Sequence, residues 1–212
     1  MLGTCSRHTL FLAAIALLAL TGCQTAGTSS SGAGSSTSAK SAKPELPQGY
    51  TCCNFHHEGD WISDSNYATL PMIPAGTPAT VTGYGRHRAY AELDGRKMRL
   101  GHDYGREQQT LQQWTAKMIV ADDPKQKIAG YPAAVQAAIK QGRIAPGMTK
   151  EQVIISVGYP LTSENAALDA PIWRMWVSSF GEYQIVWDGS GKVKEIAGDP
   201  LTRNIIVYLP PQ

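Results

Sequence analysis

Residues 147–160 read GMTKEQVIISVGYP, and this stretch predicts the best-defined helix of the chain. Thr149 followed three residues later by Gln152 is the pattern of a capping box, in which each side chain bonds the other residue's backbone N–H. Met148 precedes the cap and can pack against Val153 as a hydrophobic staple. Because glycine and proline end the pattern, we expect a helix that begins at Thr149 and stops before the glycine.

Two further helices are expected before this one. Leu111, Trp114 and Met118 recur at helical spacing within residues 106–120, and an Asp-Asp-Pro sequence then breaks the pattern. Residues 132–142 start with a proline, which costs no hydrogen bond in a first helical turn, and end with a glycine. The sequence therefore predicts three helices in succession.

Three strand-like segments follow, at residues 173–177, 182–187 and 192–197. A glycine-rich turn joins the last two, which favours an antiparallel meander. Alternate residues of the first segment are apolar, so one face of the sheet can bury against the helices. Residues 204–209 are expected to add a fourth strand or to pack across an edge.

The first half of the chain predicts a small β domain, because residues 66–105 alternate short β-prone runs with turn residues. The clearest feature is a hairpin in which residues 88–93 and 96–100 flank Asp94-Gly95. Asp-Gly suits the positive φ angles of a two-residue turn.

Together these patterns predict an α+β protein in four parts. A signal peptide is expected at 1–22, a tether at 23–47, the small β domain at 48–105, and a helical layer packed on a three- to four-stranded antiparallel sheet at 106–212. The tether is mostly Ser, Gly, Thr, Ala, Lys and Pro, a composition that cannot bury enough apolar surface to fold.

The chain begins with the features of a secretory signal. Arg7 precedes an uninterrupted apolar run from Leu10 to Leu20. Eleven apolar residues rise only about 16 Å as a helix, whereas the hydrocarbon core of a bilayer is about 30 Å thick. A permanent transmembrane helix is therefore not expected here.

The sequence Leu20-Thr21-Gly22-Cys23 resembles the lipobox of bacterial lipoproteins, and the alternative is an ordinary signal peptide with a chance cysteine. The resemblance implies cleavage before Cys23, a diacylglycerol on its thiol, and a fatty acid such as palmitate on the new amino terminus. Two or more acyl chains hold a protein stably at a membrane. Gln24 stands where an aspartate would favour the inner membrane, so the resemblance implies a periplasm-facing protein of the outer membrane.

Charge excludes one class of partner. Without Arg7 the chain has 18 basic and 17 acidic residues, a formal charge of +1. Such a balance gives no electrostatic basis for binding nucleic acid.

Residues 132–197 resemble the SmpA/OmlA (BamE-like) lipoproteins. The matching motifs are GMTKEQV at 147–153, VGYP at 157–160, WRMW at 173–176, EYQIVW at 182–187 and GKV at 191–193. The resemblance implies a two-helix layer on a three-stranded sheet and an accessory role in β-barrel assembly.

A shorter stretch, IPAGTPATV at residues 73–81, together with the Asp94-Gly95 hairpin, resembles part of a bacterial SH3-like small barrel. This resemblance implies binding of peptide or cell-wall material, and it carries over no ligand residue.

Cys52, Cys53, His56 and His57 form the cluster with metal-capable side chains. In an extended chain, neighbouring residues point to opposite faces, which splits the four ligands. Closed zinc sites also use wider paired spacings, so we expect no metal and no cofactor other than the lipid on Cys23. Metal binding, a buried or ring-strained thiol pair, and partner contact remain open alternatives. A disulfide between neighbours would join no distant segments.

No nucleophile elbow, metalloprotease helix or phosphate-binding glycine loop is present in the sequence. His87 and His102 are expected on strand or loop surfaces. We therefore expect no enzyme, but a scaffold or accessory factor in outer-membrane assembly or integrity that works through protein contacts, with β-barrel assembly proteins as candidate partners. The alternative is a peptidoglycan- or cell-wall-binding module.

Exposed aromatic residues are the expected partner contacts, because tryptophan and tyrosine dominate interface hot spots. The candidates are Tyr159, Trp176, Phe180 and Tyr183, although core packing explains each of them equally well.

Overall fold

The computed structural model describes residues 45–210, and this part of the chain is α+β, as the sequence predicted. The expected signal peptide, Cys23 and the tether up to residue 44 lie outside the described residues. Of the helices in residues 45–210, none has both the length and the apolar character needed to span a bilayer.

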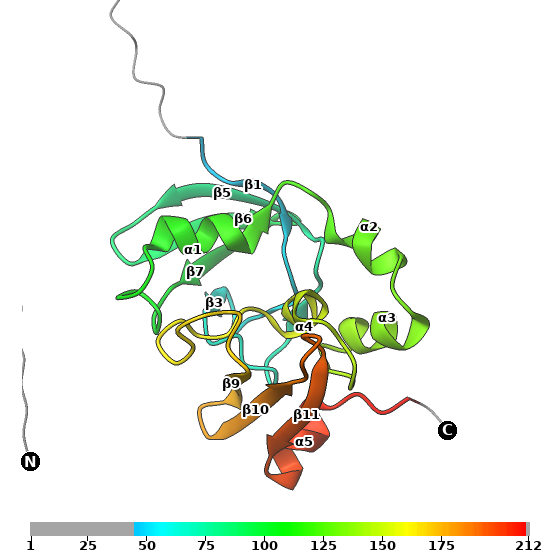
Figure 1. The fold of residues 1–212 in the computed structure, drawn as a ribbon. Helices are drawn as coiled ribbons and strands as arrows, with labels where there is room; N and C mark the ends of the chain where they lie inside the picture. Colours follow the sequence, from blue (N-terminus) through cyan, green and yellow to red (C-terminus); the bar gives the residue numbers. More distant parts are fainter. Residues whose placement is uncertain (1–44, 211–212) are drawn as a thin grey trace, which may run out of the picture. The chain divides into compact units, whose positions relative to one another are not determined.

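A six-stranded sheet forms the first part of the fold and curls into a half-barrel (Figure 1). Its strand order is β3-β7-β6-β5-β1-β8, and β3 pairs with β7 in parallel, whereas the other neighbours are antiparallel. The strands are β1 (Gln48–Thr51), β3 (Trp61–Ser63), β5 (Pro78–Tyr84), β6 (Arg88–Leu93), β7 (Arg96–Gly101) and β8 (Ile119–Val120). The predicted hairpin is confirmed: β6 and β7 meet at Asp94 and Gly95, both with positive φ.

Helix α1 (Leu111–Met118) packs against this sheet, and Trp114 and Met118 lie in its hydrophobic core (Figure 1). The helix begins later than the sequence pattern suggested. Thr110 caps it, because its hydroxyl accepts the Gln113 backbone N–H and the Gln113 side chain accepts that of Thr110.

The second part of the fold is the predicted antiparallel sheet, with strand order β11-β10-β9. Its elements are α3 (Ala133–Lys140), α4 (Lys150–Val157), β9 (Ile172–Ser178), β10 (Gly181–Trp187) and β11 (Val193–Gly198). The α4 capping box between Thr149 and Gln152 is confirmed. Trp173, Met175 and Val177 bury one face of β9 in a core shared with both helices, as the alternation predicted.

The structure corrects the sequence interpretation at the C-terminal end. Residues 204–209 do not form a fourth strand: residues 204–206 are the end of helix α5 (Pro200–Ile206), and residues 207–209 follow it. The Asp199 carboxylate accepts the Leu201 and Thr202 backbone N–H groups, and Pro200 occupies the first turn. These start signals override the β-prone apolar run at residues 205–209, in which only Val207 forms a parallel bridge, with Ile144.

One helix was not expected from the sequence. Asp123 caps α2 (Pro124–Ala129) by accepting the Lys125 backbone N–H, and Pro124 again lies in the first turn. The acidic and proline residues that end the α1 pattern therefore also start a new helix.

Asn54 joins the two parts of the fold through hydrogen bonds of its buried amide. Its Nδ2 donates to the carbonyl oxygens of Ile139 (2.7 Å) and Ser156 (2.9 Å), and its Oδ1 accepts the Ala75 backbone N–H (2.9 Å). Its own backbone N–H donates to Ile155 (3.0 Å). The Asn54 side chain thus connects the segment before β5 with the helices α3 and α4.

Asn66 makes a second set of such bonds, and its φ of 46° places it in the left-handed region that asparagine tolerates. Its Nδ2 donates to Asn54 (3.0 Å) and Val157 (2.9 Å), and its Oδ1 accepts the His56 backbone N–H (2.7 Å). His56 lies in β2 (Phe55–His56), which pairs with β4 (Met72–Ile73). The two asparagines therefore hold one short β pair against the end of α4.

The outer edge of β9 is occupied by a side chain. Asn165 donates from Nδ2 to the Arg174 carbonyl oxygen (2.9 Å) and accepts the Arg174 backbone N–H at Oδ1 (2.8 Å). Farther along the same strand, Thr69 donates from its backbone N–H and its hydroxyl to Val177. Both backbone groups of Arg174 are thereby paired without another strand.

Candidate functional site

A cleft of about 710 Å³ lies where the end of β1, the start of α2 and the helix α4 meet. Its volume falls in the range of ligand pockets. The apolar part of the lining includes Cys52, Ile154, Ile155, Tyr159 and Leu168. A hollow of about 720 Å³ beside α1 is lined mostly by polar side chains, whereas this cleft combines apolar and charged groups, and we take the cleft as the candidate site.

Charged side chains form the rim of the cleft. Lys127 on α2 and Glu151 on α4 are 2.6 Å apart, with both side chains more than half exposed. An exposed ion pair of this kind contributes little to stability. Asp122 and Asp123 add negative charge beside it. The rim can therefore pair with polar groups of a ligand that covers the apolar floor.

Lys150 has a more fixed position on the same rim. Its Nζ donates to the carbonyl oxygens of Leu168 (2.7 Å) and Ala170 (3.3 Å), and it lies 5.6 Å from the ring centre of Trp173 and 5.4 Å from that of Trp187. Cation–π contacts and carbonyl bonds together restrain this ammonium. One positive charge is thus held between the cleft and the hydrophobic core of the three-stranded sheet.

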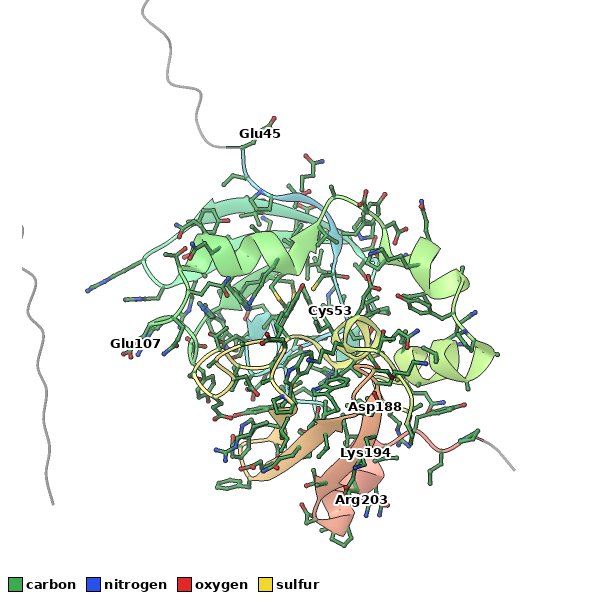
Figure 2. All side chains as sticks on the ribbon, viewed as in Figure 1. Glu45, Cys53, Glu107, Asp188, Lys194 and Arg203 are labelled. Carbon is green, nitrogen blue, oxygen red and sulfur yellow. The ribbon has the colours of Figure 1, made fainter. Side chains whose placement is uncertain are left out.

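Cys52 and Cys53 lie directly after β1, and their Sγ atoms are 2.6 Å apart. Cys52 lines the cleft and is 7% exposed, whereas Cys53 is 0% exposed, in the interior of the described part (Figure 2). Burial raises the pKa of the Cys53 thiol above its ordinary value, and the positive charge of Lys117 acts in the opposite direction. The two neighbouring cysteines therefore differ in their access to the cleft.

The histidines next to these cysteines have other partners. His56 contacts the Leu70 carbonyl oxygen through Nδ1 (2.8 Å), and His57 contacts that of Gly59 (2.8 Å). Burial lowers the pKa of His56. Within residues 45–210, no group of three or more His, Cys, Asp or Glu side chains is arranged to hold a metal ion.

The four aromatic residues expected as contacts do not share one surface. Tyr159 lines the cleft below Lys117, whose Nζ is 4.8 Å from the ring centre, and burial raises the pKa of Tyr159 to about 12. Trp176 lies half-exposed on β9 and donates to Glu164 (2.7 Å). Phe180 is 97% exposed in the turn after β9. Tyr183 is 2% exposed and lies in the hydrophobic core of the three-stranded sheet, which is the core-packing alternative that the sequence left open.

Another expectation is corrected at His102, which we placed on the surface. It is 5% exposed, its Nδ1 lies 2.9 Å from Asp64 Oδ2, and its ring stacks on Trp114 at 5.2 Å. Asp64 also accepts the backbone N–H groups of the three residues that follow His102. The pair therefore fixes the loop after β7.

Sequence reasoning missed this pair and the two asparagines because their partners are distant. Asp64 and His102 are 38 positions apart, and Asn54 reaches Ser156 across 102 positions. The one local signal is Asn66, a residue type that tolerates the positive φ of a turn, and this signal does not identify its hydrogen-bond partners. His87, in contrast, is exposed, as expected.

Comparison with family models, with curated proteins and with solved structures found no match to this chain.

Proposed function

We propose that the protein is an outer-membrane lipoprotein that acts, without catalysis, as a scaffold or accessory factor in outer-membrane assembly or integrity. The observation that carries this proposal is the lipobox-like sequence Leu20-Thr21-Gly22-Cys23 after an eleven-residue apolar run. Acyl chains on Cys23 would hold the folded part on the periplasmic side of the membrane.

The fold of residues 132–198 supports the finer assignment to the SmpA/OmlA (BamE-like) type. Two helices, α3 and α4, share a core with an antiparallel three-stranded sheet, which is the arrangement that the resemblance implies. We also propose that the half-barrel is an SH3-like domain, on the basis of its curled sheet and its Asp94-Gly95 hairpin. A fold alone does not define a partner, so the proposed role needs a direct test.

The cleft supports binding through protein contacts. A peptide segment would place apolar side chains on Ile154 and Tyr159 and would meet the ionic groups of Lys127 and Glu151 at the rim. Such a division into an apolar centre and a polar rim is common in protein interfaces. We therefore place the partner contact of this lipoprotein in the cleft.

The membrane part of the proposal is tested with Cys23→Ser in the full chain. The wild-type chain is expected to incorporate radiolabelled palmitate and to fractionate with outer membranes, and the variant is expected to do neither. A Cys23→Ser chain that still fractionates with outer membranes contradicts lipid anchoring.

The partner is tested by in-cell crosslinking from a photoreactive residue at position 168. Leu168 is exposed and lines the cleft, and Leu209 is exposed outside the cleft and serves as the control position. We expect a β-barrel assembly protein to crosslink from position 168 and not from 209. No crosslink from 168, or the same products from both positions, contradicts a contact in the cleft.

Binding to peptidoglycan is the second candidate, and the half-barrel is the observation in its favour. It predicts that the full chain in detergent sediments with purified peptidoglycan. Sedimentation without a protein crosslink would favour this candidate over the first.

A further inference from the structure

The Cys52–Cys53 pair is not used by the proposed function, and its surroundings give it a defined geometry. The Thr51 backbone N–H donates to Thr77 (2.9 Å), the Cys52 N–H donates to Met118 (2.9 Å) and the Asn54 N–H donates to Ile155 (3.0 Å). The backbone is thus hydrogen-bonded before, at and after the pair. Within this restrained segment the two sulfur atoms face each other at 2.6 Å.

Access to the two sulfurs is unequal. Cys52 contributes to the lining of the cleft, whereas Cys53 does not and has no exposed surface. Of the two cysteines, only Cys52 therefore borders the space that a molecule in the cleft would occupy. The Cys53 sulfur is within reach of Cys52 alone among the cysteines of residues 45–210.

Two opposing effects act on thiolate formation at the pair, because burial raises the pKa of Cys53 and the positive charge of Lys117 acts against that rise. The Lys117 ammonium interacts electrostatically with both cysteines and lies over the ring of Tyr159. A neighbouring cation lowers the cost of forming a thiolate, the species that attacks disulfides. Partial burial acts against this cation by lowering the pKa of Lys117.

We propose that Cys52 and Cys53 form a thiol–disulfide exchange site at the floor of the cleft, with Cys52 as the attacking sulfur and Cys53 as the resolving sulfur. The co-reactant is a small disulfide or an exposed disulfide of another protein. Its presence in the cell rests on the proposed export, because disulfides persist in oxidising compartments.

The exchange proceeds in two displacements. The Cys52 thiolate attacks one sulfur of the external disulfide, whose S–S bond breaks, and one external thiol leaves. Cys53 then gives up its proton and attacks the Cys52 sulfur, so that the mixed disulfide breaks and the second external sulfur leaves as a thiolate, which takes up that proton. The protein dithiol is oxidised to a Cys52–Cys53 disulfide, and the external disulfide is reduced to its thiols.

Adjacency makes the product readily reversible. Consecutive Cα atoms are about 3.8 Å apart across a trans peptide, which is shorter than the separation of about 4.4 Å or more in ordinary disulfides. A bond forced into a shorter span is more easily reduced. The site is therefore suited to exchange and not to permanent crosslinking.

The test uses the full chain, purified in detergent, reduced, and then exposed to glutathione disulfide. Chymotrypsin releases residues 51–55, TCCNF, which separates this pair from Cys5 and Cys23. For the wild type we expect this peptide to lose two hydrogen atoms and to resist alkylation by N-ethylmaleimide. A peptide that remains an alkylatable dithiol overturns the proposal.

Two serine variants separate the roles of the sulfurs. Cys53→Ser is expected to retain one glutathione on Cys52, since no resolving thiol remains. Cys52→Ser is expected to leave Cys53 unmodified in the folded chain. Equal modification of both variants overturns the assignment of roles.

A measurement on the wild type guards against variants that do not fold. With limiting N-ethylmaleimide, the singly labelled peptide should carry its label on Cys52, and a label on Cys53 contradicts the proposal. Because these reactions use purified protein, their failure leaves the lipid anchor untouched, whereas loss of membrane fractionation in the wild type would leave the exchange chemistry untouched.

Discussion

The two sheets of this protein are built from different kinds of strand pairs. In the three-stranded sheet, β9, β10 and β11 follow each other along the chain and pair with their immediate successors. In the half-barrel, only β5, β6 and β7 do so, while β1 pairs with the distant strand β8 and β3 pairs in parallel with β7. The difference is between local pairing and pairing across long loops.

The comparison shows that long-range pairing here depends on buried polar side chains. Asn54 and Asn66 hold the segment between β1 and β5 against α4, and Asp64 fixes the loop after β7. Buried polar groups are costly unless each has a partner, and these groups have several. Substitution of these polar side chains should therefore lower the free energy of unfolding, although they are not part of any apolar pattern in the sequence.

The largest effect is expected for Asn54→Ala. The change removes bonds to Ile139, Ser156 and Ala75; the Ile139 carbonyl keeps the Gly142 N–H, but the buried Ser156 carbonyl and Ala75 N–H lose their partner. Each such group costs about 1–3 kcal/mol, so we expect the free energy of unfolding to fall by about 3 kcal/mol or more. Urea denaturation measures this, with Asn204→Ala on exposed α5 as the control. Equal stability of the two variants would show that the amide does not hold the two parts together.

The next effect is expected at Gly158, where α4 ends. Its φ of 87° and ψ of 178° suit glycine alone, and an added Cβ would lie 2.6 Å from Asn66 Nδ2. We expect Gly158→Ala to cost about 1–3 kcal/mol for backbone strain, and more from the contact with Asn66.

Gly147 provides a matched control for Gly158→Ala. It also has a positive φ, of 83°, but an added Cβ would meet no atom within 4 Å. Gly147→Ala should therefore show backbone strain without the contact. If the two variants unfold at the same urea concentration, the Asn66 contact contributes nothing.

A smaller effect is expected from pH. Burial lowers the pKa of His56 from its ordinary value near 6.5, the neighbouring His57 also lowers it, and the Leu70 carbonyl raises it. At pH values well above 6.5, the His56 ring is neutral in both the folded and the unfolded chain, and its contribution to stability is complete. As pH falls below about 6.5, the unfolded chain takes up the proton first, so the folded state loses stability until the lower folded pKa is passed.

This pH effect is isolated by comparing the wild type with His56→Asn, which keeps a donor for Leu70. The free energy of unfolding of the variant, followed by urea titration between pH 7 and pH 5, should fall less steeply than that of the wild type. Parallel curves would assign the pH dependence to other groups.

The smallest effect on stability is expected for Phe180→Ser, because this side chain is almost wholly exposed. The change should stay within about 0.5 kcal/mol, as for most surface positions. Tyr183→Ser, at a buried position of β10, should cost about 3 kcal/mol or more. Similar urea midpoints for the two variants would contradict the assignment of surface and core.

Local chemistry explains which elements could be predicted from the sequence. The Thr149–Gln152 capping box and the Asp94-Gly95 turn each depend on residues within four positions, and both are confirmed. At residues 204–209 two local signals competed, and the cap at Asp199 prevailed over the β-prone apolar run.

The candidate site was less accessible to sequence reasoning. Cys52, Lys127 and Tyr159 come from three separate segments, and only the folded chain brings them to one cleft. The sequence marked Cys52 and Cys53 as unusual and left a thiol pair open, but it gave no information on which sulfur faces the cleft. His102 was misplaced because its partner, Asp64, precedes it by 38 residues.

The amide of Asn165 also limits how copies of this protein can associate. An edge strand with free backbone groups is a template on which another chain can add a strand, and crowding raises the chance of such addition. At Arg174 the edge of β9 has no free donor or acceptor to offer, because Asn165 occupies both. Neighbouring copies therefore cannot extend the sheet through the middle of this strand, and self-association along it is blocked without an added proline or bulge.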